Sequence, residues 1–403
     1  MSPGNQDILQ QPADRVHFAP ETIETTHSFK EDIPQLLYRD DIKKGDRMQP
    51  DYVHEVIFVI RQKNMDKLTL MLHDISDPLS ANYGYHLSGD EIATLTSNPE
   101  SLNAVANFLV LNGVSAQSQS LHGEYLTANA TVLIWEEMFN TVFYSFDVLQ
   151  NKKVEAVVRA ERYWIPKELE LHVESVFNTI QIPRVIYGDL GRIRSQGLRT
   201  EIIAPGVVTP AKLKQFYNIT TKGSARSTQG IFATVQLYFS PADLASFQTQ
   251  LAPPAYPVST IIGNHSSDSF CIQTPGSCAE PNLDLQYMMS MSPGSPTTYW
   301  YTDQSFTDWL VSVAAYPNRP LVFSISYGSS ESSMSGSELA AFNTQMIKLG
   351  AMGVTVVVAT GDDGANSPEV RSSSYGTSAC GYSPVFPASS PYVTSVGATK
   401  VSY

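Results

Sequence analysis

One nearly all-apolar run, Val354-Thr355-Val356-Val357-Val358-Ala359, constrains the fold of this chain more than any other segment. A strand of this kind is typical of a parallel sheet that helices cover on both faces. Short apolar runs alternate with helical patterns before it, which predicts strands at 230–235 and 321–326 and helices at 240–251 and 335–349. The second half of the chain is therefore predicted to be an α/β domain with a parallel sheet.

The first half of the chain has a different pattern, which predicts an α+β domain. A β-rich run at 54–60 precedes a helical pattern at 64–72, and a longer helical stretch at 88–111 is broken near Asn98-Pro99. The β-branched and aromatic residues at 131–146 indicate strands. We expect an irregular segment at 1–50, a first domain at 51–183, an exposed linker with a processing site at 184–206, and a second domain at 207–403.

Composition disfavours several classes of function. The 403 residues include 26 basic and 39 acidic side chains, and the resulting formal charge of −13 would repel nucleic acid. No apolar run is long enough to span a bilayer, and no secretory signal peptide is visible. Cysteines 271, 278 and 380 form no Cys-x-x-Cys pair, so we expect no zinc site, although Cys271 and Cys278 could close a short disulfide loop.

Three carboxylates are candidates for chemistry. Glu280 and Asp284 are four residues apart, a spacing that places side chains about 5–6 Å apart on one helix face, where they could share a proton. Asp362 lies in a Gly-Asp-Asp-Gly turn directly after the apolar strand, at the end of the sheet where functional residues gather. This set suggests acid-dependent hydrolysis. The alternatives are a solvated helix face for the pair and an ordinary glycine-flanked turn for Asp362.

Several segments resemble the sedolisin family of serine-carboxyl peptidases, of the kumamolisin and tripeptidyl-peptidase type. The stretch 76–88, Ser-Asp-Pro-Leu-Ser-Ala-Asn-Tyr-Gly-Tyr-His-Leu-Ser, is similar to the hallmark of the family's activation propeptide. Residues 208–219 resemble the start of the mature enzyme, and residues 239–244 match its next segment. The resemblance implies a ferredoxin-like α+β propeptide, bound within the same chain to an incomplete subtilisin-like α/β domain with a parallel sheet.

The resemblance also implies roles for the candidate residues. Glu280 would be the general base, Asp284 the residue that orients and polarises it, and Asp362 the acid of the oxyanion hole. The substrate backbone would be bound as an added strand by Ser324, Ser326, Tyr327 and Gly328. The base must be ionised, whereas Asp362 must be protonated to donate a hydrogen bond, so activity is expected in acid, which would also trigger self-cleavage in the linker.

The family's nucleophile is expected outside this sequence. It lies in Ser-Gly-Thr-Ser-Ala, downstream of the segment that corresponds to residues 386–397, and this motif does not occur in the 403 residues. The stretch 376–379 imitates the motif but precedes that segment, so Ser378 is interpreted as a decoy. The family's calcium site is likewise expected in the full-length family member, with no metal ligand identifiable in this chain.

The leading hypothesis is the precursor of an acid-acting serine-type peptidase, either a tripeptidyl-peptidase or an endopeptidase, with peptides or proteins as substrates. The chain as written is expected to be inactive, and the family implies a lysosomal, vacuolar or extracellular location. The alternative is a non-catalytic truncated homologue that acts as a propeptide chaperone or inhibitor, or has no function. A conventional subtilisin is disfavoured because it needs a catalytic histidine, and only His265 follows the linker.

Overall fold

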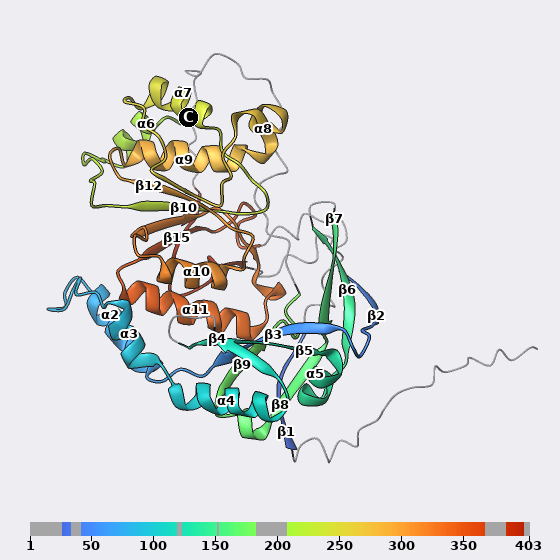
Figure 1. Ribbon diagram of the computed structural model, residues 1–403. Helices are drawn as coiled ribbons and strands as arrows, with labels where there is room; N and C mark the ends of the chain where they lie inside the picture. The colour runs from blue at the N-terminus through green and yellow to red at the C-terminus, as the bar shows by residue number, and fades with distance from the viewer. Residues whose placement is uncertain are drawn as a thin grey trace, which may run out of the picture.

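The computed structural model describes residues 26–33, 42–118, 123–150, 153–182, 208–366 and 384–398. They form an N-terminal domain that ends at residue 182 and a C-terminal domain that begins at residue 208 (Figure 1). The expected linker at 184–206, Ser378 and Cys380 lie outside the described residues. Across the described part of the chain, no helix has the length and apolar character that crossing a membrane requires.

The N-terminal domain is a mixed α/β unit whose strands form sheets of order β4-β5-β3-β9, β2-β6-β7 and β1-β8, all antiparallel. Its strands are β1 (His27–Asp32), β2 (Ile42–Arg47), β3 (Val53–Ile60), β4 (Ser115–Ser118), β5 (Tyr125–Thr131), β6 (Phe143–Gln150), β7 (Lys153–Ala160), β8 (Arg162–Pro166) and β9 (Val173–Phe177). Its helices are α2 (Met65–Ser76), α3 (Gly89–Thr96), α4 (Pro99–Leu111), α5 (Val132–Phe139) and the short 3-10 turn η2 (Lys167–Leu169). The expected break in the helical stretch at Asn98-Pro99 is confirmed, because α3 ends before it and α4 begins at Pro99.

Two expectations for the N-terminal domain are corrected. The segment 131–146 was expected to form strands, but α5 occupies its first half and β6 only begins at Phe143. The helical spacing of Trp135 and Phe139 explains the difference: both are fully buried, their rings stack at 5.5 Å, and packing outweighs the β-propensity of the segment. The first 50 residues were expected to be irregular, yet they contain β1 and β2.

The C-terminal domain contains the predicted parallel sheet, in the order β11-β12-β10-β13-β15-β17. Its strands are β10 (Gln229–Ala233), β11 (Thr260–Ile262), β12 (Thr297–Tyr301), β13 (Val322–Ile325), β14 (Ser329–Ser330), β15 (Thr355–Ala359), β16 (Val385–Phe386) and β17 (Thr394–Val396). Its helices are α6 (Pro210–Phe216), α7 (Pro241–Leu251), α8 (Asp268–Gln273), α9 (Ala279–Met291), α10 (Phe306–Ala315) and α11 (Gly336–Ala351), with 3-10 turns η3 (Pro275–Ser277) and η4 (Glu331–Ser333).

Helices cover both faces of this sheet, as the apolar strand β15 predicted. Figure 1 shows α7 and α9 on one face and α10 and α11 on the other. On the first face, Leu285 and Met289 of α9 pack against Ile231 and Tyr299 of the sheet. On the second face, the helices α10 and α11 enclose a larger aromatic core that includes Trp309, Phe323 and Phe342. The sheet therefore holds α9 in a fixed position above its strands.

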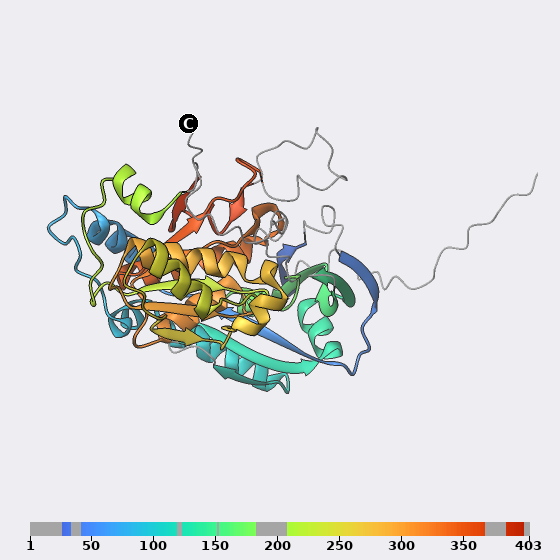
Figure 2. The same cartoon turned by 90° about the horizontal axis from the view of Figure 1, so that it is seen from above.

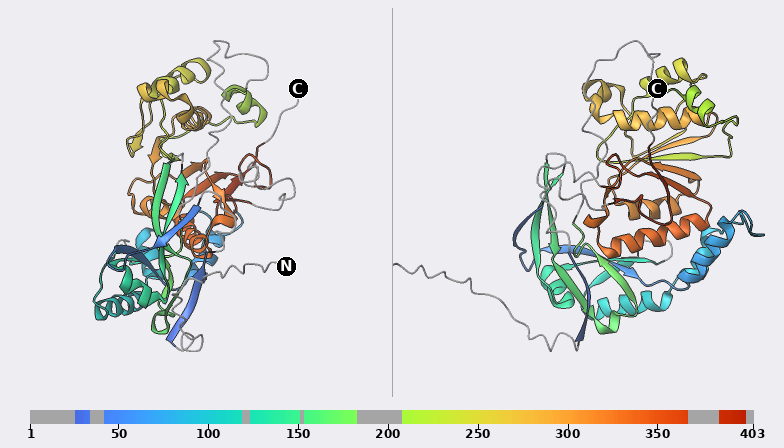
Figure 3. Two further views of the ribbon diagram at one scale, coloured as in Figure 1. Left: turned by 90° about the vertical axis from the view of Figure 1, so that its right-hand side faces the viewer. Right: turned by 180° about the vertical axis from the view of Figure 1, so that it is seen from behind.

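The N-terminal domain lies along the C-terminal domain, from α2 at one end to β6 and β7 at the other (Figures 1 and 2). The N-terminal domain contacts the C-terminal domain mainly through α11, as the view from behind shows (Figure 3). Leu68 and Ile75 of α2 and Ile92 of α3 share one buried cluster with Ile347 and Ala351 of α11. The two domains are therefore joined by a continuous apolar contact.

Two glycines at the end of α11 allow this close approach. A Cβ atom at Gly350 would lie 3.0 Å from Leu72, and one at Gly353 would lie 2.7 Å from the His86 ring. The Leu87 amide donates a hydrogen bond to the Ala351 carbonyl at 2.8 Å, across the domain boundary. His86 and Leu87 belong to the hallmark stretch 76–88, so part of this stretch binds the end of α11.

Candidate active site

The first two candidate carboxylates, Glu280 and Asp284, lie on α9, one turn apart. Two anchors fix the start of this helix. Cys278, the residue that precedes α9, forms a disulfide with Cys271 of α8, which confirms the pairing that the sequence allowed. Asn282 accepts a hydrogen bond from the Ser240 amide at 2.8 Å, which ties α9 to the start of α7. The predicted helical placement of the pair is therefore confirmed.

Asp284 is held from the sheet side by Ser326, the residue that follows β13. The Ser326 hydroxyl donates a hydrogen bond to Asp284 Oδ1 at 2.8 Å. Asp284 Oδ2 is buried and has no hydrogen-bond partner among the described residues. Burial and, to a smaller extent, the charge of Glu280 raise the pKa of Asp284, the Ser326 hydrogen bond opposes them, and the resulting pKa is about 8. Burial therefore favours the protonated form of Asp284 in the folded protein.

Two buried tyrosines complete the surroundings of Asp284. Burial and the charge of Asp284 raise the pKa of both Tyr299 and Tyr327, so their phenols stay neutral. The Tyr299 hydroxyl donates to the Leu237 carbonyl at 3.1 Å, whereas the Tyr327 hydroxyl has no hydrogen-bond partner within the described part of the chain. No sequence pattern singled out Tyr299, because a tyrosine in a strand is ordinarily a core residue.

The predicted substrate-binding segment begins inside the sheet, in β13, and continues past the carboxyl end of this strand. Ser324 pairs with Ile231 of β10 on one side and Val357 of β15 on the other, so its backbone lies inside the sheet rather than at an open edge. The chain leaves the sheet at Ser326, whose hydroxyl is engaged by Asp284. The ring of Tyr327 packs against Phe232 in the core. Ser324 is thus paired with a strand on each side, and substrate binding by this segment stays a prediction.

Asp362 lies at the same end of the sheet, beyond the carboxyl ends of the parallel strands. It follows β15, whose Val358 is the partner of Ile325 in β13, so the two strands end side by side. Gly328 and Gly361 both lie against the side chain of Val385, which a Cβ atom at either position would crowd. The turn requires glycine at 361, where φ is +87°. Asp362 itself is exposed, and its role in an oxyanion hole stays a prediction.

The remaining candidates of the sequence can also be placed. His265 stacks on Tyr301 with 3.2 Å between ring centroids, and its Nδ1 atom contacts the Gly263 carbonyl oxygen. Among the described residues, no group of three or more His, Cys, Asp or Glu side chains is arranged to hold a metal ion.

Comparison with known proteins found sequences that are similar to this chain. Residues 40–182 match the family model described as the pro-kumamolisin activation domain. The chain is 28% identical over 390 residues to tripeptidyl-peptidase 1 of Rattus norvegicus, an alignment that covers 93% of this chain and 66% of the relative. It is 27% identical over 370 residues to tripeptidyl-peptidase 1 of Homo sapiens, with 88% and 63% covered. It is 28% identical over 383 residues to tripeptidyl-peptidase 1 of Dictyostelium discoideum, with 85% and 61% covered.

The chain spans less than two thirds of the length of these relatives. The match at 40–182 covers most of the N-terminal domain, which is therefore an activation propeptide that lies against the C-terminal domain of the same chain. The matches to the relatives extend over most of the chain, so they include the domain that carries Glu280 and Asp284. On these findings, this chain is similar to the sedolisin family: its N-terminal domain matches the activation domain, and most of its length is similar to tripeptidyl-peptidase 1.

Proposed function

We propose that this chain supplies the propeptide, the general base and the orienting acid of an acid-acting serine-type peptidase. The observation that carries the proposal is the buried Asp284, one helical turn after Glu280 and hydrogen-bonded to Ser326 at the edge of a parallel sheet. The names of the relatives support a tripeptidyl-peptidase, with an endopeptidase as the alternative. Peptides or proteins would be the substrates, and a lysosomal, vacuolar or extracellular compartment would provide the acid.

The proton on Asp284 explains how the pair would work. A serine hydroxyl attacks a peptide carbonyl only when a base accepts its proton, and that base must be ionised. Because the pKa of Asp284 is raised to about 8, Asp284 holds a proton in acid and Glu280 can be the ionised partner. The protonated carboxyl would orient Glu280, and Ser326 would fix the carboxyl through its 2.8 Å hydrogen bond. Glu280 would then return the proton to the leaving amine.

Asp362 would stabilise the oxyanion of the tetrahedral intermediate. It can donate a hydrogen bond to an oxyanion only as a carboxylic acid, so this step requires acid. Its exposed turn, Gly361 to Gly364, lies beside the end of β13 and is open to solvent protons. Glu280 would set the lower pH limit of activity, because it must be ionised, and Asp362 would set the upper limit, because it must be protonated. We therefore propose a narrow acidic range of activity.

The nucleophile has to come from outside these residues in this scheme. The motif Ser-Gly-Thr-Ser-Ala is absent from the 403 residues, so the chain alone is proposed to be inactive. We extend the proposal to the finer fold, a ferredoxin-like propeptide on a subtilisin-like domain. Calcium belongs to the proposal only for the full-length family member, and no step above depends on it.

The proposal is tested with the substitution Glu280→Gln in a longer natural polypeptide that contains the Ser-Gly-Thr-Ser-Ala serine. The amide keeps the shape of the side chain but cannot accept the serine proton, so hydrolysis of tripeptide-releasing substrates at acidic pH is expected to fall by about 10²–10⁴-fold. Asp303→Asn is the matched control, because it removes one exposed carboxylate of the same domain. Retained activity in Glu280→Gln with a normal circular dichroism spectrum would refute Glu280 as the base.

A further inference from the structure

Asn129 of the propeptide is an exposed asparagine whose side chain plays no part in the fold. It lies in β5, the strand between β4 and β3 of the four-stranded sheet, and asparagine is a disfavoured residue in strands. Its side chain makes no hydrogen bond to another described residue. The residues paired with it on either side, Glu55 and Ser115, are exposed as well, so the surface around Asn129 is open to solvent.

Thr131, two residues later, makes no capping hydrogen bond to the helix that follows it. It directly precedes α5, at the position where a serine or threonine hydroxyl ordinarily accepts a hydrogen bond from the helix backbone. Thr209 before α6 and Ser335 before α11 accept such bonds, whereas the Thr131 hydroxyl does not. A threonine at this position therefore contributes no cap to α5.

Asn129, Ala130 and Thr131 together form the acceptor triplet of N-linked glycosylation, Asn-x-Thr with x other than proline. In that reaction the asparagine Nδ2 atom forms a bond to C1 of the first sugar of an oligosaccharide. The bond between this sugar and the diphosphate of a lipid-linked donor breaks, and the amide nitrogen loses one proton. The two side-chain groups that the reaction requires, an amide and a hydroxyl, are the two that this part of the fold does not use.

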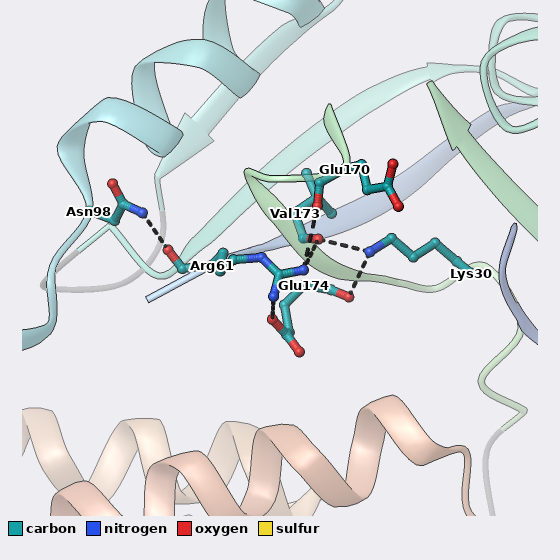
Figure 4. A network of polar contacts seen from close by, with 6 residues as sticks. All are labelled: Lys30, Arg61, Asn98, Glu170, Val173 and Glu174. Carbon is teal, nitrogen blue, oxygen red and sulfur yellow. Dashed lines mark hydrogen bonds and ion pairs between the residues drawn. The ribbon is translucent and has the colours of Figure 1, made fainter. Parts of the chain in front are cut away.

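Other asparagines of the propeptide have a structural role. Asn98 donates a hydrogen bond to the Arg61 carbonyl at 2.9 Å, as Figure 4 shows. Its side-chain oxygen also accepts from the Ser101 amide and so caps α4. The Asn64 side chain donates to the Leu95 carbonyl at 2.8 Å. Neither Asn98 nor Asn64 begins an acceptor triplet, so the side chain that the triplet contains differs in its contacts from these two.

Two further acceptor triplets begin at Asn218 and Asn264, in the C-terminal domain. Both asparagines are exposed, and their φ angles are +51° and +52°. Asparagine adopts this left-handed conformation more readily than most residues, so the backbone alone explains an asparagine at both positions. Asn129 has no such explanation, because it lies in an extended strand. The inference therefore rests on Asn129 alone.

A glycan on Asn129 is compatible with the docked propeptide. Side chains of a strand alternate between the two faces of its sheet, so Asn129 shares a face with Thr127 and Tyr125. Tyr125 is buried against α11, where it accepts a hydrogen bond from Gln345, and Thr127 is buried as well. Four residues of strand place Asn129 about 13 Å beyond Tyr125. A glycan there lies beside the C-terminal domain and outside the contact with α11.

We propose that Asn129 is an N-linked glycosylation site of the propeptide, with an oligosaccharide as the attached group. The inference rests on the proposed function only for the compartment, because the transfer takes place in the secretory pathway, which leads to the lysosomal, vacuolar or extracellular location. The ability to accept the sugar is a property of the chain itself. It can be measured without peptidase activity.

The test is glycan mapping of the 403-residue chain, expressed in a eukaryotic host behind a cleavable secretion signal. Mass spectrometry of its peptides, before and after treatment with a peptide N-glycosidase, shows which asparagines carry sugar in the secreted and the retained protein. We expect a glycan on Asn129 in the majority of molecules. An unmodified Asn129 in both fractions would overturn the proposal, whatever is found at Asn218 and Asn264.

Two variants of Thr131 are the matched controls. Thr131→Val keeps Asn129 and the shape of the side chain but removes the hydroxyl, so the glycan on Asn129 should be lost, whereas Thr131→Ser keeps the hydroxyl and should retain it. Because the hydroxyl does not cap α5, the urea midpoint of Thr131→Val should equal that of the enzymatically deglycosylated parent. Equal glycan content in Thr131→Val and the parent would refute the assignment. Glu280→Gln should leave the glycan in place, so failure of this site and failure of the proposed mechanism are distinguishable.

Discussion

The raised pKa of Asp284 predicts how the stability of the C-terminal domain depends on pH. The folded-state pKa is about 8, whereas an aspartate in an unfolded chain has a pKa near 3.9. Between these values the folded protein holds a proton that the unfolded chain releases. Stability from this group is therefore complete below about pH 3.9 and is lost as the pH rises toward 8. The substitution Asp284→Asn should remove this dependence, because its amide imitates the protonated acid and can still accept from Ser326.

The magnitude follows from linkage. Each pH unit inside the window changes the free energy of unfolding by about 1.4 kcal/mol when one proton is released. From pH 5 to pH 7 the unchanged protein should therefore lose up to about 3 kcal/mol relative to Asp284→Asn. The value is an upper bound because Glu280 titrates with Asp284, and part of the proton uptake is shared. At pH 3.5 the two proteins should have nearly the same stability.

Urea denaturation at pH 3.5, 5, 6 and 7 measures this difference, followed by tryptophan fluorescence. Two of the four tryptophans, Trp300 and Trp309, are buried in the C-terminal domain. The comparison uses the difference between the two proteins at each pH, so titrating groups that do not interact with Asp284 cancel, and only Glu280 adds to the difference. If this difference stays constant from pH 5 to pH 7, Asp284 does not hold a proton in the folded state, and the assignment of Glu280 as the ionised base loses its support.

Two further predictions concern the local frame of the site. Replacing Cys271 and Cys278 together by serine opens a short loop at the start of α9 and should lower the free energy of unfolding by about 2–3 kcal/mol in urea, whereas an unchanged value would show that the disulfide does not stabilise the domain. Gly361→Ala should lower the free energy of unfolding by about 1–2 kcal/mol more than Gly364→Ala does. Both glycines have positive φ, but only a Cβ atom at 361 would contact Val385, at 3.1 Å. Equal losses in the two variants would refute crowding at 361.

The fold was predictable where the apolar residues of a segment clearly follow the pattern of a buried strand or of a helix. The all-apolar strand β15 and the capped helices α7 and α11 have strong local signals, and the structure has them within two residues of the expected bounds. Helix α5 was not predicted, because its β-branched and aromatic residues have strand propensity and only tertiary packing of Trp135 and Phe139 decides for helix. Strands β1 and β2 were missed for a related reason, since their polar sequences gain regular structure only from their partners β8 and β6.

The candidate site was predictable in its members but not in their contacts. Helical spacing placed Glu280 and Asp284 on one face of α9, and the position after β15 placed Asp362 at the sheet edge. The hydrogen bond from Ser326 to Asp284 joins residues 42 apart, and no local pattern encodes it. The burial that raises the pKa of Asp284 arises from Tyr299, Tyr327 and the sheet, so it too depends on the assembled fold.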